Sequence, residues 1–338
     1  MSRIAVIMPA YDAATHLERA VPAALAARGE ATFLVVDAGS TDGTGAVAER
    51  LGAEVLRLPH RVGPAEARNA GVAHTEGEIL LFVDSDCALH EDAVRRVEAA
   101  FAADPALVAL SGSYDADPPE PNFFSQYMNL RHHLTHQWAA RDTPSFWAGC
   151  GAVRRSAFEA VGGFDAERYP RPMIEDIELA TRLAPIGRLA FDPEIQATHQ
   201  KRWSGRGVVE TDLRCRALPW ARLIASTGRM PDTLNLSLRE RASAALAPLA
   251  LASCVGLFCA IGLGAPVLGA ACIAVIGLAI ALGWRWVRGF ARLRGPGFAL
   301  RAWLFHQVHQ SYSGAAFGLF MLRHHLRRRP ADRPPTTR

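Results

Sequence analysis

The residues best placed to do chemistry begin with one pair of carboxylates. Asp84 and Asp86, separated by Ser85, directly follow the apolar run at residues 79–83. Such a run predicts a strand buried on both faces. Ligands in open α/β sheets bind beyond the carboxyl ends of the strands, where carboxylate oxygens suit a divalent cation. An Asp-x-Asp sequence after a strand is also ordinary turn chemistry, so this spacing alone leaves both interpretations open.

A second pair of carboxylates, Glu175 and Asp176, opens a predicted amphipathic helix at residues 174–183. The positive end of a helix dipole favours acidic side chains in the first turn, which explains the pair without any function. A carboxylate at that position can equally point into a cleft and act as a general base.

Alternating strands and helices must position these side chains. Short apolar runs predict strands at residues 4–8, 33–36, 54–58, 79–83 and 107–110. Helical composition and start signals predict helices at residues 14–27, 46–51, 64–75 and 91–103. Strands and helices that alternate at this spacing indicate an α/β fold with a mostly parallel, Rossmann-like sheet covered by helices.

The alternation stops at the Pro- and Asp-rich residues 115–121. Residues 122–140 then predict a helix with a polar face of Arg131, His132, His133 and His136. A solvated face is favoured over a metal site, because no carboxylate lies at ligand spacing. Residues 146–151 follow as a strand-like approach into a Gly-rich turn. Gly149 there would let backbone come close to a ligand, although a tight turn explains it nearly as well.

The composition excludes several classes of protein. A net charge of +4 over 338 residues is too small to indicate nucleic acid binding. The six cysteines show no Cys-x-x-Cys spacing, and three of them lie in a long apolar stretch. Neither a disulfide framework nor a zinc site is therefore expected.

The apolar stretch is residues 242–284, which hold no charged side chain over 43 positions. This is about twice the length that crosses a hydrocarbon core. Segments 244–264 and 265–284 predict a transmembrane helical hairpin with a very short turn. Arginines flank both ends, so the positive-inside rule places both flanks in the cytoplasm. With no signal peptide at the N-terminus, we expect a multi-pass protein of the bacterial inner membrane whose catalytic part is cytosolic.

Two segments beside the hairpin are expected at the membrane surface. Residues 203–241 interleave arginines with Trp and Leu, a mix that suits an anionic surface, and Pro219 is expected to interrupt any helix there. Residues 302–322 lack Asp, Glu, Lys and Arg. A re-entrant or interfacial helix is favoured there over a third span, which would carry the arginines from Arg323 onward across the membrane.

These features predict four regions. They are residues 1–205 as the catalytic domain, 206–241 as an amphipathic juxtamembrane segment, 242–284 as two transmembrane helices, and 285–338 as a cytosolic or interfacial region.

Several ordered motifs in about the first 205 residues resemble those of the family 2 glycosyltransferases, inverting enzymes of the GT-A fold. They are Pro9-Ala10-Tyr11-Asp12, residues 35–44 from Val35-Val36-Asp37 onward, Ala67-Arg68-Asn69-Ala70-Gly71, Asp84-Ser85-Asp86, Glu175-Asp176 and His199. Together they are far more specific than any one of them.

The resemblance implies a role for each motif. The donor-binding positions would be Pro9, Tyr11, Asp12, Asp37, Arg68, Asp84, Ser85 and Gly149. Mg²⁺ or Mn²⁺ would be held by Asp86, Asp84 and His199, with Asp86 as the direct ligand. Asp176, beside Glu175, would be the catalytic base. Arg202 and Trp203 would lie on the acceptor and membrane side.

Two positions depart from the family pattern. Ala38 stands where many members have a second Asp, which leaves the main acidic position, Asp37, intact. The segment from His199 to Trp203 partly resembles the Gln-x-x-Arg-Trp signature of processive synthases, but His replaces the required Gln. This replacement argues against processive synthesis.

The resemblance implies inverting, metal-dependent transfer of a sugar from a UDP- or GDP-type donor to a membrane-associated acceptor such as a polyprenyl phosphate or a glycolipid. One alternative is a membrane scaffold with a catalytically inactive nucleotide-sugar-binding domain. Another is a nucleotidyltransferase or a dinucleotide-binding oxidoreductase on a similar sheet. This alternative would need Gly-x-Gly-x-x-Gly after the first strand, and residues 8–12 do not contain it.

Overall fold

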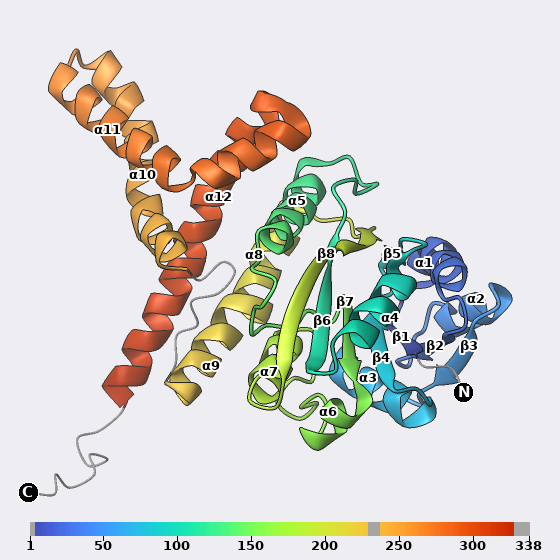
Figure 1. The fold of residues 1–338 in the computed structure, drawn as a ribbon. Coiled ribbons are helices and arrows are strands. Elements are labelled where there is room, and N and C mark those ends of the chain that lie inside the picture. Colours follow the sequence, from blue (N-terminus) through green and yellow to red (C-terminus); the bar gives the residue numbers. More distant parts are fainter. Residues whose placement is uncertain (1–3, 229–236, 328–338) are drawn as a thin grey trace, which may run out of the picture. The chain divides into compact units, whose positions relative to one another are not determined.

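The computed structural model describes residues 4–228 and 237–327, and its contacts divide the chain into two units, Met1–Gly205 and Arg206–Arg338. The first unit is a mixed sheet covered by helices (Figure 1). Its strands are β1 Ile4–Ala10, β2 Thr32–Asp37, β3 Glu54–Arg57, β4 Ile79–Val83, β5 Cys87–Leu89, β6 Leu107–Tyr114, β7 Cys150–Arg154 and β8 Arg188–His199. Its helices are α1 Ala14–Ala27, α2 Thr44–Arg50, α3 Pro64–His74, α4 Ala93–Ala103, α5 Phe123–Gln137, α6 Arg155–Ala160 and α7 Glu175–Leu183.

The sheet order is β3-β2-β1-β4-β7-β6-β8-β5. The first four strands are parallel, whereas β7 runs antiparallel to both β4 and β6. Strand β8 is parallel to β6 and antiparallel to β5. The predicted α/β fold is therefore confirmed, with a parallel half that carries β4 and a mixed half that follows it.

Two apolar layers enclose the sheet. Alternate residues of β1 and β4 pack against α1, α2 and α4 on one face, and the others pack against α3, α6 and α7 on the second face. All five residues of β4 are fully buried. Strands buried on both faces read as unbroken apolar runs, which is why these strands could be predicted from the sequence.

The Gly-rich turn lies before its strand and not after it. Residues 144–149 form a loop, and the strand β7 begins only at Cys150. A Cβ atom on Gly149 would come within 2.5 Å of the Trp147 ring, and one on Gly151 would come within 2.7 Å of the Phe146 ring. The aromatic side chains lie against the two glycines and leave no room for a Cβ atom at either position.

The expected solvated face on α5 was wrong. Arg131 and His136 are each only 7% exposed. The His136 ring lies 4.6 Å from Trp147 and 5.6 Å from Phe191, measured between centroids. Burial lowers the pKa of His136 to about 3, so this ring is neutral and serves as packing.

The second unit is helical. It contains α8 Gly205–Thr211, the π-helix η1 Asp212–Ala217, α9 Leu218–Thr227, α10 Leu238–Gly262, α11 Pro266–Leu282 and α12 Trp284–Arg327. The expected helix break at Pro219 is not observed, because this proline lies in the first turn of α9 and the π-helical turn before it accommodates the missing N–H. Helix α12 bends at Gly295, whose φ is 80°.

The predicted hairpin corresponds to α10 and α11, which pack against each other in the second unit. By length and composition α10 could cross a membrane, whereas α11 passes that test only jointly with α12, across a bend of 72°. Residues 302–322 lie within α12. Their polar residues His306, Gln307, His309 and Gln310 are buried, and Gln310 accepts a 3.0 Å hydrogen bond from the Ser243 hydroxyl of α10.

Candidate functional site

The first carboxylate pair lies beyond the carboxyl end of β4, where the sheet changes from parallel to antiparallel. The Asp84 backbone N–H donates to the Gly149 carbonyl at 3.2 Å, which ties this turn to the loop before β7. One Asp84 oxygen accepts a 2.7 Å bond from Arg68 of α3. Burial raises the pKa of Asp84, although the Arg68 charge opposes that shift. Asp84 is thus committed to a protein partner on one oxygen.

Arg68 joins the two carboxylate pairs. Its guanidinium donates to Asp84 and, at 3.0 Å, to Oε1 of Glu175 in α7. The Arg68 side chain is 5% exposed. Burial opposes its charge, but the carboxylates of Asp84, Glu175 and Asp176 together raise its pKa above the ordinary arginine value. Arg68 is therefore a permanent buried cation among three acids.

Asp86 faces a different partner. The pairing of β5 with β8 places Cys87 opposite His199, which brings the preceding Asp86 to that histidine. Oδ2 of Asp86 lies 3.5 Å from Nε2 of His199. Burial would raise the pKa of Asp86, but the charge and hydrogen bonding of His199 outweigh it and hold the pKa well below the usual range. Asp86 is an ionised carboxylate beside an imidazole.

The charge of Asp176 is poorly stabilised by its surroundings. Its Oδ2 accepts from the Ala148 backbone N–H at 3.2 Å and its Oδ1 from the Ile177 N–H at 2.8 Å. Burial, followed by the neighbouring Glu175 charge, raises its pKa to about 7. A carboxylate with such a pKa can take up a proton near neutral pH, as a general base requires.

Glu175 differs from Asp176 in that one of its oxygens accepts from a charged side chain. Oε1 accepts from Arg68, and Oε2 accepts a 2.8 Å bond from the Met173 backbone N–H. Glu175 is only 5% exposed. Its geometry suits a positioning role toward Arg68 and the start of α7.

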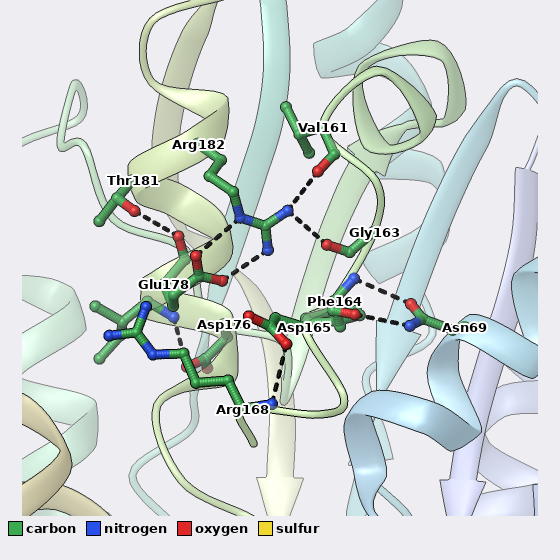
Figure 2. Close-up of polar contacts among 11 residues, drawn as sticks. Asn69, Val161, Gly163, Phe164, Asp165, Arg168, Asp176, Glu178, Thr181 and Arg182 are labelled. Carbon is green, nitrogen blue, oxygen red and sulfur yellow. Dashed lines mark hydrogen bonds and ion pairs between the residues drawn. The ribbon is translucent and has the colours of Figure 1, made fainter. Parts of the chain in front are cut away.

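A second network fixes the loop before α7 (Figure 2). The side-chain amide of Asn69 in α3 donates to the Phe164 carbonyl at 2.8 Å and accepts from the Phe164 backbone N–H at 3.0 Å. Arg182 donates to the carbonyls of Val161 and Gly163 and forms an ion pair with Glu178. These bonds hold the loop from two sides and so restrict the position of α7, which carries Asp176.

The predicted donor-side residues cluster at the ends of β1 and β2. Asp37 ends β2, and its Oδ1 accepts from the Ser40 N–H at 2.9 Å. Asp12, with φ of 45°, accepts from the Thr41 N–H at 2.8 Å and so links the loops after β1 and β2. The Tyr11 ring is covered by Arg61 at 4.4 Å. Pro9, which pairs with Val36 in the sheet, precedes this cluster within β1.

A close approach at Gly45 supports the Asp37 position. A Cβ atom there would lie 2.6 Å from Oδ2 of Asp37 and 2.8 Å from Nε of Arg57. Gly45 thus leaves the room that the Asp37 carboxylate occupies, and a larger residue would displace it.

The remaining predicted residues are dispersed. Ser85 lies between the two acids of the turn, and Gly149 accepts the bond from Asp84. Arg202 is exposed and pairs with Glu120 at 3.1 Å. Trp203 is buried, and its backbone N–H donates to the Ser125 hydroxyl at 2.7 Å. The Lys201 ammonium lies 4.4 Å from the Trp203 ring centroid. Within the part of the chain that the structure describes, neither Arg202 nor Trp203 forms a hydrogen bond or ion pair with the two carboxylate pairs of the site.

The site can supply part of a metal shell. Within residues 4–228 and 237–327 no group of three His, Cys, Asp or Glu side chains is assembled to hold a metal. Asp86 and His199 nevertheless offer one carboxylate oxygen and one imidazole nitrogen to the same small space. Mg²⁺ and Mn²⁺ commonly use one or two protein ligands plus substrate phosphate oxygens, so these residues fit such an ion.

Some functional positions were not predicted from the sequence. The Tyr114 ring stacks on His199 with centroids 4.2 Å apart and planes 10° apart, which fixes the imidazole beside Asp86. The Ala148 N–H that holds Asp176 also escaped prediction. Both contacts join segments distant in sequence, and no local pattern signals them.

Residues 5–162 match the family model described as glycosyl transferase family 2. The N-terminal unit carries a family 2 glycosyltransferase domain. The matched range contains the Asp84-Ser85-Asp86 turn and Arg68, while α7 and β8 lie beyond it.

Two relatives illustrate the similarity of the family 2 glycosyltransferase domain. The pre-mycofactocin glycosyltransferase of Mycobacterium tuberculosis (strain CDC 1551 / Oshkosh) is 28% identical over 211 residues, 59% of this chain and 43% of that protein. The chain thus spans less than half the length of that relative. The succinoglycan biosynthesis protein ExoA of Rhizobium meliloti (strain 1021) is 27% identical over 280 residues, 74% of this chain and 83% of ExoA.

A solved structure shows the same fold. The mannosyltransferase PcManGT from Pyrobaculum calidifontis, in complex with GDP-Man and Mn²⁺, matches with a TM-score of 0.56 at 21% identity. The match covers 95% of this chain and 87% of PcManGT. It supports the GT-A-like fold expected from the sequence.

Proposed function

We propose that this chain transfers a sugar from a nucleotide-sugar donor to a membrane-associated acceptor, with inversion and without processive synthesis. The observation that carries the proposal is a contrast between two carboxylates. Asp86 is ionised beside His199, whereas the pKa of Asp176 is raised to about 7. The pKa of Asp86 is lowered, as a ligand of a metal and diphosphate needs, and the pKa of Asp176 is raised, as a proton acceptor needs.

The donor would bind across the loops that end β1, β2 and β4. Asp37, whose carboxylate occupies the room that Gly45 leaves, would accept hydrogen bonds from the base. Asp86 and His199 would hold Mg²⁺ or Mn²⁺ with the diphosphate, and the bound ion would stabilise the negative charge that grows on the leaving group. GDP-Man and Mn²⁺ in PcManGT are consistent with such a donor and ion.

Arg68 would act through its neighbours. Both of its carboxylate bonds lie inside the protein, so we propose that it keeps Asp84 and Glu175 charged and fixed and adds a positive field at the diphosphate. This differs from the direct donor contact expected from the motif alone.

Asp176 would accept the proton of an acceptor hydroxyl as the new glycosidic bond forms on the face opposite the leaving group. With an acceptor that is already ionised, such as a lipid phosphate, Asp176 would only orient the group. Arg202 and Trp203 would lie on the acceptor side.

The decisive experiment supplies the purified protein, in vesicles that contain total bacterial lipid, with labelled UDP- and GDP-sugars. Label should enter the lipid extract with at least one donor and be lost with the Asp176→Asn variant. A panel without any transfer, or equal transfer by the variant, would contradict the proposed reaction. Persistent donor binding without transfer by the wild type would favour the inactive-scaffold alternative.

Metal use is tested separately. Chelation with EDTA should stop transfer, and Mn²⁺ or Mg²⁺ should restore it. Electron paramagnetic resonance should show Mn²⁺ bound with nucleoside diphosphate, and the Asp86→Asn variant should lose that signal. Full transfer after chelation would remove the ion from the proposal.

We also propose that residues 1–205 form the catalytic domain and that the C-terminal helices attach it to the cytosolic face of a bacterial inner membrane. One helix of sufficient length and apolarity and the bacterial relatives are consistent with membrane association. The arginines that flank the hairpin favour the cytosolic side. Two complete crossings by the hairpin, as expected from the sequence, require a test of their own.

A further inference from the structure

The α10–α11 hairpin has an apolar outer surface. Its side chains exposed by more than half include Leu249, Val255, Phe258, Ile261, Leu263, Val267, Ile273 and Leu278. The only hydroxyl side chains in residues 242–283 are Ser243 and Ser253, which are 3% and 6% exposed. A surface that hides its few polar groups and shows its apolar ones is suited to lipid and not to water.

The base of the hairpin is polar. Arg239 donates to the carbonyls of Leu282 and Ala281 at the end of α11, at 2.7 and 2.9 Å. Glu240 accepts a 3.0 Å bond from the Trp286 indole. Trp284, at 54% exposed, lies at this same end, where an indole suits the membrane interface. These groups mark one water-facing boundary.

The tip of the hairpin, residues 261–267, has no matching boundary. It carries no charged, hydroxyl, amide, Trp or Tyr side chain, and Ile261, Leu263 and Val267 are 72%, 77% and 82% exposed. A turn that emerges into water or headgroups on the far side would gain from polar or aromatic anchors of the kind found at the base.

Consecutive backbone N–H groups of the tip are hydrogen-bonded within the hairpin, as a hydrocarbon environment requires. The N–H groups of Leu263, Gly264 and Ala265 all donate to carbonyls at the end of α10, at 2.9, 3.3 and 2.9 Å. The next residue, Pro266, has no N–H. Unpaired backbone donors are costly in hydrocarbon, so this turn withdraws four consecutive positions from that cost.

The length of α11 agrees with a hairpin that inserts only part of the way into the bilayer. With its 17 residues α11 is roughly 25 Å long at 1.5 Å per residue, which is shorter than the roughly 30 Å hydrocarbon core. The 25 residues of α10 would span that core, so the depth of the tip is limited by α11, whose end is joined to the start of α10 through Arg239.

We propose that the α10–α11 hairpin is re-entrant: it enters the bilayer from the cytosolic side, its tip ends within hydrocarbon, and neither helix crosses. The inference rests on the membrane association proposed above and replaces the two crossings expected from the sequence. Lipid acyl chains would cover the apolar surface of the hairpin. Both ends of the hairpin would lie on the cytosolic side of the membrane, and no part of the hairpin would reach the opposite side.

Cysteine labelling tests the proposal in the full chain. Cys215, Cys254, Cys259 and Cys272 are replaced by Ala, while Cys87 and Cys150 stay because they are fully buried. Leu263→Cys then reports on the tip and Leu238→Cys, at a 72% exposed position, reports on the base. The proteins are reconstituted in vesicles of phosphatidylethanolamine and phosphatidylglycerol and treated with an impermeant maleimide from outside or from the lumen.

We expect the base cysteine to react from one side only and the tip cysteine to react from neither. A bimane on the tip, attached before reconstitution, should be quenched by lipids that carry a spin label on the acyl chain. Reaction of the tip from the side opposite the base would show two crossings and overturn the re-entrant hairpin alone. Reaction of tip and base from the same side would overturn membrane insertion, and neither result bears on sugar transfer.

A charge at the tip gives an independent measure. Leu263→Asp would place a carboxylate in hydrocarbon if the hairpin is re-entrant, and the variant should partition into vesicles on the order of 100-fold more weakly. The matched Leu238→Asp variant at the base should bind like the wild type. A crossing hairpin would tolerate both changes equally, and equal binding would contradict the proposal.

Discussion

The two units depart from the usual distribution of side chains in opposite ways. The N-terminal unit buries charge, with Glu175 at 5% exposure beside Arg68 at 4%. The C-terminal unit exposes apolar groups, with Phe258 at 78% exposure on the hairpin. Burying charge costs free energy that ion pairs only partly return, and exposing apolar surface to water costs free energy too. The buried charges mark the candidate active site of the N-terminal unit, and the exposed apolar side chains mark the proposed lipid-facing surface of the C-terminal unit.

One aspartate from each unit, Asp212 and Asp176, shows how the partners of a carboxylate differ between the two units. Asp212 of η1 is 2% exposed and pairs with Arg216 at 3.0 Å, His309 at 3.0 Å and Tyr312 at 2.7 Å. Asp176 receives only two backbone N–H groups and retains a raised pKa. A fully paired carboxylate stabilises a fold, and an under-stabilised one is available for proton transfer.

The largest effect is expected at Asp176. Asp176→Asn should lower the transfer rate to a hydroxyl acceptor by about 1,000-fold, the range typical of a lost general base. Calorimetry should show donor binding unchanged. Glu159→Gln, on the surface of α6, is the matched control and should retain full activity. If the Asp176→Asn variant transferred sugar at the wild-type rate, Asp176 would be excluded from the reaction.

Arg68→Met is expected to reduce stability as well as activity. Asp84 and Glu175 would lose their shared cation, and an unpaired buried charge costs about 3 kcal/mol. Urea unfolding followed by fluorescence should show this loss, whereas Arg95→Met, at an exposed position, should show none. Adding Glu175→Gln to the Arg68 variant should restore part of the stability. A stable single variant would show that Arg68 does not balance these acids.

Asp212→Asn sharpens the comparison between the two aspartates. It should lower the stability of the detergent-solubilised protein by about 2 kcal/mol, because charged hydrogen bonds become neutral ones. The turnover number per folded molecule should stay unchanged, in contrast to Asp176→Asn. Tyr312→Phe, which removes one of the three partners, should have a smaller effect in the same direction. A large loss of turnover at unchanged stability would contradict the structural role of Asp212.

The pH dependence near neutrality involves the smallest change, a single proton on Asp176. Asp176 must be ionised to accept a proton, so kcat/KM should rise about tenfold per pH unit below 7 and level off above it. Its folded pKa of about 7 exceeds its unfolded value, so its contribution to stability is greatest below pH 4 and is lost as the pH rises toward 7. A flat profile between pH 5 and 8 would contradict a hydroxyl acceptor and favour one that is already ionised.

Local patterns in the sequence predict much of the fold. The strands β1, β2 and β4 are buried on both faces, so each is an unbroken apolar run that a single sequence reveals. Strands β5 and β8 were not predicted. β5 has three residues, and β8 mixes buried and partly exposed positions. Their strand state comes from pairing with distant partners, which local propensity does not encode.

The same division holds for the candidate site. The sequence by itself determined the carboxylates, their order along the chain and the long uncharged stretch at residues 242–284, because these are properties of composition and spacing. Only the tertiary structure decided that Asp84 pairs with Arg68 while Asp86 faces His199. Two acids one residue apart point in different directions at a turn, and their partners lie far away in sequence. Neighbours in space, and not in the chain, therefore set the charge and the role of each.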